Sequence, residues 1–226
     1  MAAFRHAVEL GYDYLETDVH MTADGVLVAM HDDDLHRVTD MRGTIAAMDW
    51  AQVSKARIGG QEPVPKMVEL LDAFHEARFM IDPKSDTAVD PLIRMLSDRG
   101  DVDRVCIGSF EQRRLQRVRR ALPAVATAAG PWEIRLLRLA SWGVIPKRLL
   151  HPSYELVSVP EVHEGATILD ESFVRTCHDV GVPVHVWTVN ERSDMHRMLN
   201  LGVDGIVTDE LEDLREVFIQ RGCWNP

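Results

Sequence analysis

The chain has 226 residues, 46% of which are hydrophobic, and it carries a formal net charge of −11 at pH 7. This length and apolar content suffice for one sizeable core. The acidic balance argues against a protein that binds duplex nucleic acid, because neutralising phosphates requires a basic face. The three cysteines, an odd number without CxxC or zinc-type spacing, argue against a disulfide framework.

The first ten residues, "MAAFRHAVEL", form an amphipathic helical pattern that stops at Gly11. They lack the charged, apolar and small-residue order of a signal peptide. The sequence also contains no run of about 18 apolar residues, the length needed to span a membrane. These features predict a cytoplasmic protein without a transmembrane segment.

Short runs of strand-forming residues then alternate with helical patterns, which is typical of βαβ units in a parallel sheet. Residues 14–19 and 26–31 are joined by the turn "TADG" and predict a hairpin. After a polar loop, residues 45–57 lead to a helix over 63–77 that Pro65 opens. Further parallel strands, each followed by a helical pattern, are predicted over residues 79–82, 105–110, 124–130, 156–160, 182–189 and 205–209.

Together with residues 14–19, these runs make seven parallel strands, whereas an α/β barrel closes with eight, each followed by a helix. An incomplete ring leaves an open edge, and because the chain opens with a helix, the missing strand is the first. The sequence therefore predicts the α/β class and a TIM-type (β/α)8 barrel that lacks its first strand. We expect a single domain over residues 1–226 that is truncated at its N-terminal end.

Several carboxylates are predicted at the ends of two of these strands. Glu16, Asp18 and His20 share one side of their strand, because side chains alternate along it. Neighbouring carboxylates repel unless one is protonated or a cation lies between them, and oxygen ligands select Mg²⁺ or Ca²⁺. Asp82 ends another strand, and Lys84 follows on the same side. Catalytic groups of this fold lie at such strand ends.

His31 and Asp32 end the second arm of the hairpin and are predicted to face the same end of the barrel. A histidine can give or take a proton near neutral pH. An anionic substrate held by a metal ion and Lys84, with His31 moving a proton, describes the hydrolysis of a phosphoester.

Two long motifs now make a resemblance specific. The run E-x-D-V-x-x-T-x-D-G extends from Glu16 to Gly25, and H-D-x-x-L-x-R-x-T-x-x-x-G extends from His31 to Gly43. Together they resemble the glycerophosphodiester phosphodiesterase family. The segments "PVPKMVELL", "IDPK", "VWTVN" and "GVDGIVTD" are similar to later parts of the same family.

The resemblance implies a barrel in which one divalent cation, Ca²⁺ or Mg²⁺, is held by three acidic residues. Carried over by motif position, these are Glu16, Asp18 and Asp82, where Asp82 replaces the family's usual glutamate. The family also uses two histidines as acid and base. The second corresponds to His31, and Lys84 would contact the phosphate.

The first family histidine belongs to a His-Arg-Gly at the end of the strand that this chain lacks. A helix of the type "MAAFRHAVELG" follows it in the family, so Met1 falls where an internal methionine could stand. We therefore expect a truncated or mis-started chain, nearly inactive and poorly soluble as expressed.

Two aromatic rings have open roles. His20 either binds the substrate or hydrogen-bonds its neighbours at the rim of the barrel. Trp187, near the end of its strand, either forms a wall for the glycerol or packs in the core. Ser109 and Phe110, at the end of another strand, are as well explained by packing as by substrate contact.

The segment 131–150, "PWEIRLLRLASWGVIPKRLL", carries two tryptophans and four basic residues in an acidic protein. One interpretation is a basic amphipathic element that makes weak contact with a membrane surface. The other is a helix packed against the barrel with its basic face in water.

The function predicted from the sequence is a metal-dependent phosphoric diester hydrolase. It would cleave glycerophosphodiesters, small-molecule substrates of phospholipid and glycerol metabolism, to glycerol 3-phosphate and an alcohol. One alternative is a catalytically inactive barrel that keeps the metal and phosphate contacts. Another is a phospholipase-type relative acting on intact lipids at a membrane surface. The sequence indicates no oligomeric state.

Overall fold

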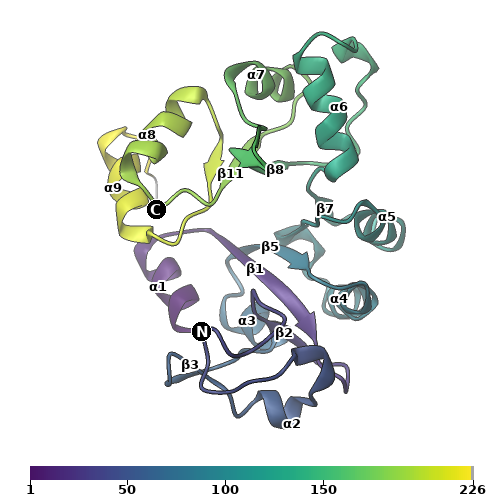
Figure 1. Ribbon diagram of the computed structural model, residues 1–226, viewed down its shortest axis with the longest axis vertical. Helices are drawn as coiled ribbons and strands as arrows, with labels where there is room; N and C mark the ends of the chain where they lie inside the picture. Colours follow the sequence, from purple (N-terminus) through teal and green to yellow (C-terminus); the bar gives the residue numbers. More distant parts are fainter. Residues whose placement is uncertain (225–226) are drawn as a thin grey trace. The chain divides into compact units, whose positions relative to one another are not determined.

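The structure is a computed structural model that describes residues 1–224. It divides into two compact units, one formed by Met1–Ser109 and Arg113–Val125, the other by Phe110–Gln112 and Ala126–Pro226. Each unit contains parallel strands connected by helices (Figure 1). The predicted α/β class is therefore confirmed, whereas a single domain over residues 1–226 stays a prediction.

The sheet of the first unit is built around β1 (Tyr14–Met21). On one edge β1 pairs antiparallel with β2 (Leu27–Ala29), which confirms the predicted hairpin. On the other edge it pairs in parallel with β5 (Arg78–Pro83), and β5 pairs in parallel with β6 (Val105–Ile107).

The turn of the hairpin explains the small polar residues of the "TADG" segment. The Thr22 hydroxyl donates to Asp24 Oδ1 at 2.6 Å and accepts from the Val26 amide at 2.9 Å. Gly25 adopts a φ of 89°, which a side chain would disfavour. The "TADG" segment thus forms a tight turn that sets the register of β1 and β2.

Helices connect the strands of the first unit. The opening helix α1 (Ala2–Leu10) ends as predicted at Gly11, whose φ is 98°. The helices that follow are α3 (Met67–Ala73), α4 (Asp86–Arg99) and α5 (Gln112–Ala121). Among these, α4 packs against both β1 and β5.

Pro65 does not open a helix, contrary to the prediction. The helix α3 begins at Met67, after Lys66. The Pro65 carbonyl accepts a hydrogen bond from the Ala29 amide at 2.9 Å, so this residue extends alongside β2. The hydrogen bond to the edge strand explains why the chain stays extended there.

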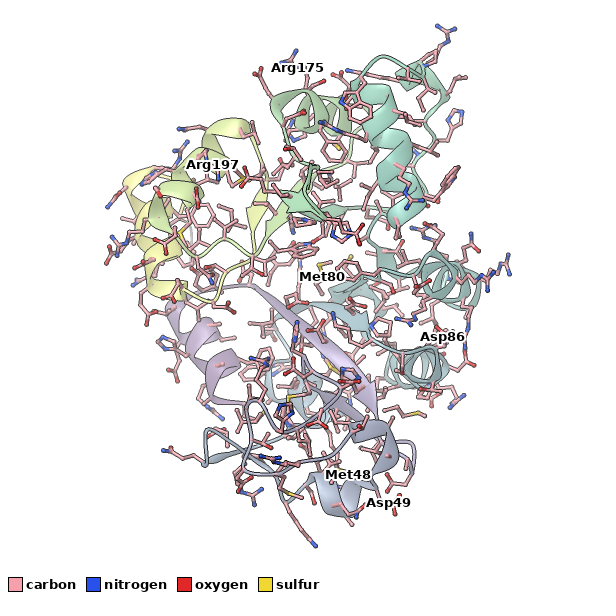
Figure 2. All side chains as sticks on the ribbon, viewed as in Figure 1. Met48, Asp49, Met80, Asp86, Arg175 and Arg197 are labelled. Atoms are coloured by element: carbon pink, nitrogen blue, oxygen red, sulfur yellow. The ribbon has the colours of Figure 1, made fainter. Side chains whose placement is uncertain are left out.

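Between the hairpin and α3, the chain forms a small layer of short elements. They are η1 (Ile45–Ala47), α2 (Trp50–Val53), β3 (Arg57–Ile58) and β4 (Glu62–Pro63). The layer has its own buried cluster, which consists of Val28, Met30, Leu35, Ile45, Val53, Ala56 and Val64. The helices η1 and α2 are separate because Met48, which follows η1, is extended. The helix α2 then begins after Asp49 (Figure 2).

The second unit contains a parallel sheet in the order β12 (Gly205–Ile206), β11 (Val184–Trp187) and β8 (Val157–Pro160). A parallel bridge between Ala128 and Leu156 brings the segment after β7 (Ala126–Thr127) beside this sheet. The described residues thus contain the seven parallel strands that the sequence predicts.

The remaining elements of the second unit surround its sheet. The helices are α6 (Pro131–Ser141), η3 (Lys147–Leu149), α7 (Glu171–Asp179), α8 (Arg192–Leu201) and α9 (Leu211–Gln220). A small hairpin that the sequence analysis missed consists of β9 (Val162–His163) and β10 (Ala166–Thr167). Within residues 1–224, no helix is both long and apolar enough to cross a membrane.

Two glycines, one in a strand and one just after a strand, differ in the side chain that lies next to them. Gly205 on β12 pairs with His185 on β11, and a Cβ at Gly205 would lie 2.5 Å from Cδ2 of the imidazole. A Cβ at Gly108, just after β6, would lie 2.9 Å from the terminal methyl of Met80 (Figure 2). The imidazole is a rigid ring, whereas the end of a methionine can move.

We expect Gly205→Ala to lower the free energy of unfolding by about 1–3 kcal/mol, because the added methyl group overlaps a ring that cannot yield. The control Gly108→Ala should change it by less than ~1 kcal/mol, since Met80 can adopt another rotamer. Urea denaturation of both variants measures the difference. Equal losses in the two would contradict the packing seen around Gly205.

Candidate active site

Asp18 and Asp82 are the centre of the candidate site. They occupy directly paired positions of the parallel strands β1 and β5. Both are buried, with relative exposures of 7% and 8%. Parallel pairing of two strands in this register therefore places two carboxylates side by side at the C-terminal ends of the strands.

Lys84 joins these two carboxylates. Its Nζ lies 2.7 Å from Asp18 Oδ1 and 3.1 Å from Asp82 Oδ2. Its backbone amide donates to the Val19 carbonyl at 3.0 Å, so the parallel ladder continues past the end of β5. Because side chains alternate along an extended chain, Lys84 lies on the same side as Asp82. The ammonium thus offsets part of the repulsion between the two acids.

The balance of charge at this point still favours a further cation. Burial, together with the charge of Asp18, raises the pKa of Asp82, although the charge and hydrogen bond of Lys84 act to lower it. Burial would lower the pKa of Lys84, but its bonds to the two carboxylates outweigh this and raise it. Asp82 Oδ1 is buried without a hydrogen-bond partner. A buried acceptor of this kind is rare in proteins and suits a hard divalent cation.

Glu16, the third predicted ligand, lies two residues before Asp18 and on the same side of β1. Its residue is exposed, and it pairs with Met80 in the register of the two strands. Within residues 1–224, no three side chains of the histidine, cysteine, aspartate and glutamate types are grouped as they would be around a metal ion. The structure therefore pairs Asp18 with Asp82, and the role of Glu16 as a third ligand stays a prediction.

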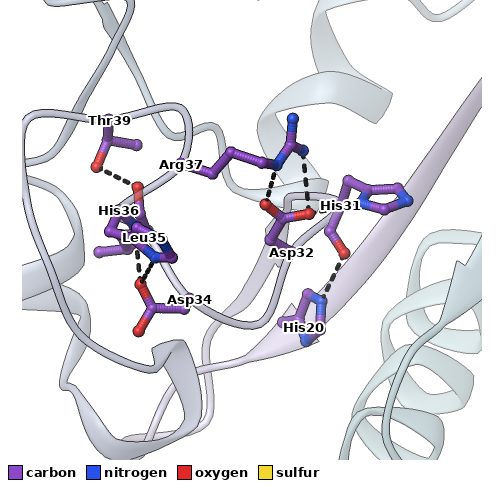
Figure 3. Close-up of polar contacts among 8 residues, drawn as sticks. All are labelled: His20, His31, Asp32, Asp34, Leu35, His36, Arg37 and Thr39. Carbon is purple, nitrogen blue, oxygen red and sulfur yellow. Dashed lines mark hydrogen bonds and ion pairs between the residues drawn. The ribbon is translucent and has the colours of Figure 1, made fainter.

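His31 follows β2 by two residues and lies in an exposed loop (Figure 3). Its Nδ1 is 2.6 Å from Asp32 Oδ1, and its side chain is 71% exposed. If Nδ1 donates to the carboxylate, Nε2 is the atom that can take or give a proton. This geometry suits an acid or base that meets a substrate from solvent.

Arg37 holds the carboxylate that holds His31. Its Nη2 lies 3.0 Å from Asp32 Oδ1, and its Nε contacts Oδ2 (Figure 3). The hydrogen bonds from Arg37, and then that from His31, lower the pKa of Asp32 well below its usual range. Asp32 is therefore ionised over the whole pH range in which the protein would work. The sequence analysis assigned Arg37 no role, although it is a fixed position of the second motif.

The other fixed positions of the second motif shape the loop that carries His31. Leu35 is fully buried, and its carbonyl accepts from the Thr39 hydroxyl at 2.8 Å (Figure 3). The Leu35 amide donates to the Gly43 carbonyl at 3.1 Å. Gly43 has a φ of 135°, and a Cβ there would lie 2.7 Å from the sulfur of Met48. These residues explain the motif as the support of a loop.

His20 lies beneath this loop. Its Nε2 is 3.2 Å from the backbone carbonyl of His31 (Figure 3), and the residue is buried with 8% exposure. His20 therefore fixes the backbone that carries the proposed acid or base. Its predicted contact with the substrate stays a prediction.

Trp187 belongs to the second unit, where it ends β11. It is half-buried, and its ring meets Phe110 edge-on with the centroids 5.6 Å apart. Phe110 itself is exposed. The two rings form an aromatic surface at the end of β11, and the role of Trp187 as a wall for the substrate stays a prediction.

Comparison with known proteins identifies relatives of the whole chain. The family model described as "Glycerophosphoryl diester phosphodiesterase family" matches residues 1–213. A protein of Mycobacterium tuberculosis named probable glycerophosphodiester phosphodiesterase 2 is 36% identical over 234 residues, which cover 100% of this chain and 86% of that protein.

Solved structures share the fold. A protein of Silicibacter pomeroyi described as a putative glycerophosphoryl diester phosphodiesterase matches with a TM-score of 0.80 and 25% identity, covering 98% of this chain and 88% of that one. A phosphodiesterase of Oleispira antarctica, solved with its product sn-glycerol-3-phosphate, matches with a TM-score of 0.79 and 20% identity. The latter match covers 96% of this chain and 90% of that one. These enzymes are TIM barrels, so the predicted fold type is confirmed.

The two hydrogen bonds from Arg37 to Asp32 lead to a prediction about the pKa of Asp32. We expect Arg37→Gln to raise the pKa of Asp32 toward the ordinary aspartate value of about 3.9, because the largest cause of its lowering is removed. In the native chain the His31–Asp32 pair then survives to lower pH than in the variant. Carboxyl ¹³C NMR titration measures the shift.

Arg42 provides the control, since it is exposed in the same loop and forms no ion pair within residues 1–224. The variant Arg42→Gln should leave the titration of Asp32 unchanged. An unchanged titration in Arg37→Gln would show that Arg37 does not hold Asp32 in solution.

Proposed function

The chain belongs to the glycerophosphoryl diester phosphodiesterase family, and on this premise we propose that it cleaves glycerophosphodiesters with the help of a divalent cation. The products are glycerol 3-phosphate and an alcohol. The name of the Mycobacterium tuberculosis relative and the product bound to the Oleispira antarctica enzyme support the reaction class.

The observation that carries this proposal is the group formed by Asp18, Asp82 and Lys84. It combines two buried carboxylates, one buried oxygen without a hydrogen-bond partner, and an ammonium that touches both acids. Buried acids placed side by side are costly for stability, so a fold keeps them where they have a use. A site for a cation and a phosphate is such a use.

One divalent cation, Ca²⁺ or Mg²⁺, would be held by Glu16, Asp18 and Asp82. When bound, it supplies positive charge to the non-bridging oxygens of the phosphate. The donor set fits, because all three ligands offer the hard oxygen atoms that these ions prefer. Asp82 is one methylene shorter than glutamate, so an ion held by this set would lie closer to β5 or bind an additional water molecule.

The remaining groups act on the substrate. Lys84 contacts the phosphate and holds Asp18 and Asp82 beside it through its ion pairs with both. His31 transfers a proton through Nε2, while Asp32 fixes the imidazole and stabilises its charged form. His20 contacts the substrate or holds the His31 backbone, and Trp187 packs against the glycerol.

We also infer that the two units form one barrel domain, because a single family model runs through residues 1–213. Phospholipid and glycerol metabolism in the cytoplasm is the setting that the sequence predicts. An enzyme acting on intact lipids is the second candidate, favoured by two exposed tryptophans, Trp132 on α6 and Trp142 directly after it. Release of glycerol 3-phosphate from soluble glycerophosphocholine by the 226-residue chain favours the first candidate, and turnover of lysophospholipid only in vesicles favours the second.

The metal assignment is tested by removing ligands. We expect Asp18→Ala or Glu16→Ala to abolish calorimetrically detectable binding of Mg²⁺ and Ca²⁺. Each should lower kcat/KM by more than ~10²-fold, since charge stabilisation by the ion is worth several kcal/mol. The exposed α4 residue Asp98 is the control, and Asp98→Ala should change neither quantity. An Asp18→Ala enzyme that works at the full rate would sink the assignment.

The role of His31 can be separated from that of the metal ligands. We expect His31→Ala to lower kcat by roughly 10²-fold or more, as for other losses of an acid or base, while metal affinity stays within about twofold. If metal affinity falls together with kcat, His31 is a ligand and its assigned role is wrong.

His36 offers a matched control for this variant. It is exposed in the same loop, and its Nδ1 lies 2.7 Å from Asp34 Oδ1, as His31 lies beside Asp32 (Figure 3). His36→Ala should therefore keep near-native kcat. Loss of activity in both variants would indicate that the loop, rather than the His31 imidazole, carries the effect.

A further inference from the structure

The α6 helix and the segment after it expose an unusual amount of apolar surface. Trp132, Trp142, Val144 and Leu149 are 58%, 62%, 63% and 61% exposed. Within residues 1–224 they are four of the nine large hydrophobic side chains that are exposed, and they fall within residues 132–149. Scattered apolar residues on a surface need no explanation, whereas a cluster marks a site of interaction.

The helical period explains why these side chains face water. Leu137 and Ala140 are buried on the side of α6 that packs against α7. Trp132 and Trp142 lie on the other side, together with Arg135, at a spacing that returns to the same face. Burial of the inner side therefore fixes the tryptophans outside.

Basic side chains accompany the tryptophans. Arg135 and Arg148 are exposed, and neither forms an ion pair within residues 1–224. The nearby acids already have partners, because Asp170 binds Arg138 and Asp179 binds Lys147. The segment thus presents positive charge in a chain whose net charge is −11.

We propose that this segment docks the protein on the surface of an anionic phospholipid bilayer. The docking surface, called here the α6 surface, consists of Trp132, Arg135, Trp142, Val144, Arg148 and Leu149. Indole rings prefer the headgroup level of a bilayer, where one edge is apolar and the other is wet. The two arginines pair with lipid phosphates at the same depth. Val144 and Leu149 add apolar contact area.

The charge pattern favours a lipid surface over another protein as the occupant. A chain with a net charge of −11 is repelled by an anionic membrane unless a basic face turns toward it. The α6 surface supplies such a face, and the repulsion of the remaining acidic surface would orient the molecule. The docking does not depend on the proposed hydrolysis, because binding needs no turnover.

The helix α5 offers a matched control for charge alone. Its sequence "QRRLQRVRRA" contains five arginines and no aromatic residue. Arg113 and Arg120 are exposed and form no ion pair within the described residues, as is also the case for Arg135 and Arg148. A double substitution on α5 therefore removes the same charge from a surface that lacks tryptophan.

The test is sedimentation of the 226-residue chain with vesicles of phosphatidylcholine alone or mixed with phosphatidylglycerol. We expect binding to the anionic vesicles that weakens with salt. Trp132→Ala with Trp142→Ala should lower the partition coefficient at least about tenfold, because two buried rings are lost. Arg135→Ala with Arg148→Ala should lower it by about fivefold per charge. Arg113→Ala with Arg120→Ala should leave it within about twofold of the native value.

Two further measurements make the result decisive. Quenching by brominated lipids should affect the tryptophan fluorescence of the native chain and should be largely lost in the double tryptophan variant. Circular dichroism and hydrolysis of soluble glycerophosphocholine show whether that variant is folded, so failure of docking is distinguishable from failure of the proposed function.

Three outcomes would overturn the proposal: no binding of the native chain to anionic vesicles at low salt, equal binding of the tryptophan variant, or equal losses in the α5 and α6 arginine variants. A native dimer in size-exclusion chromatography that dissociates in the tryptophan variant, without vesicle binding, would instead identify a second copy of the chain as the occupant.

Discussion

The pairing of β1 with β5 is the constraint on which the candidate site depends. Its register sets Asp18 opposite Asp82. The hydrogen bonding between the strands continues past Pro83 to the Lys84 amide, and the Lys84 ammonium contacts both carboxylates. A shift of one residue would move every one of these side chains to the other face of the sheet. The packing of α4 on both strands supports this pairing, and the turn at Gly25 holds β2 against the other edge of β1, so elements far from the chemistry determine the geometry of the acids.

A second level of support lies above the strands. His31 is exposed and would be mobile by itself, but Asp32 fixes its ring and Arg37 fixes Asp32. The buried Leu35 anchors this loop in the apolar cluster of the small layer. The site therefore combines rigid acids on strands with a proton-moving group on a braced loop. This division suits a reaction in which the metal site must be fixed and the acid or base must reach solvent.

The sequence predicted those features that follow from local periodicity. Alternation in β1 placed Glu16, Asp18 and His20 on one side of the strand, and "TADG" predicted the hairpin correctly. The clamp of Arg37 on Asp32 could not be predicted in this way, because it depends on how the loop turns back through Gly43. Pro65 was wrongly assigned to a helix start, since a hydrogen bond from Ala29 keeps it extended. Contacts between distant segments override local signals at both places.

Some exposed arginines of this acidic chain form ion pairs and others do not, and this difference supports the role proposed for the α6 surface. Figure 2 labels two examples, Arg175 on α7 and Arg197 on α8. Arg175 pairs with Glu171, and Arg197 pairs with Glu161 and Asp194. Exposed pairs of this kind add little stability, and they arise readily where acids are in excess. An arginine beside exposed tryptophans that forms no ion pair is therefore informative, because the nearby Asp170 and Asp179 are already paired with Arg138 and Lys147. A surface that combines such arginines with exposed indole rings is complementary to phosphate and hydrocarbon together, which is the chemistry of a lipid headgroup region.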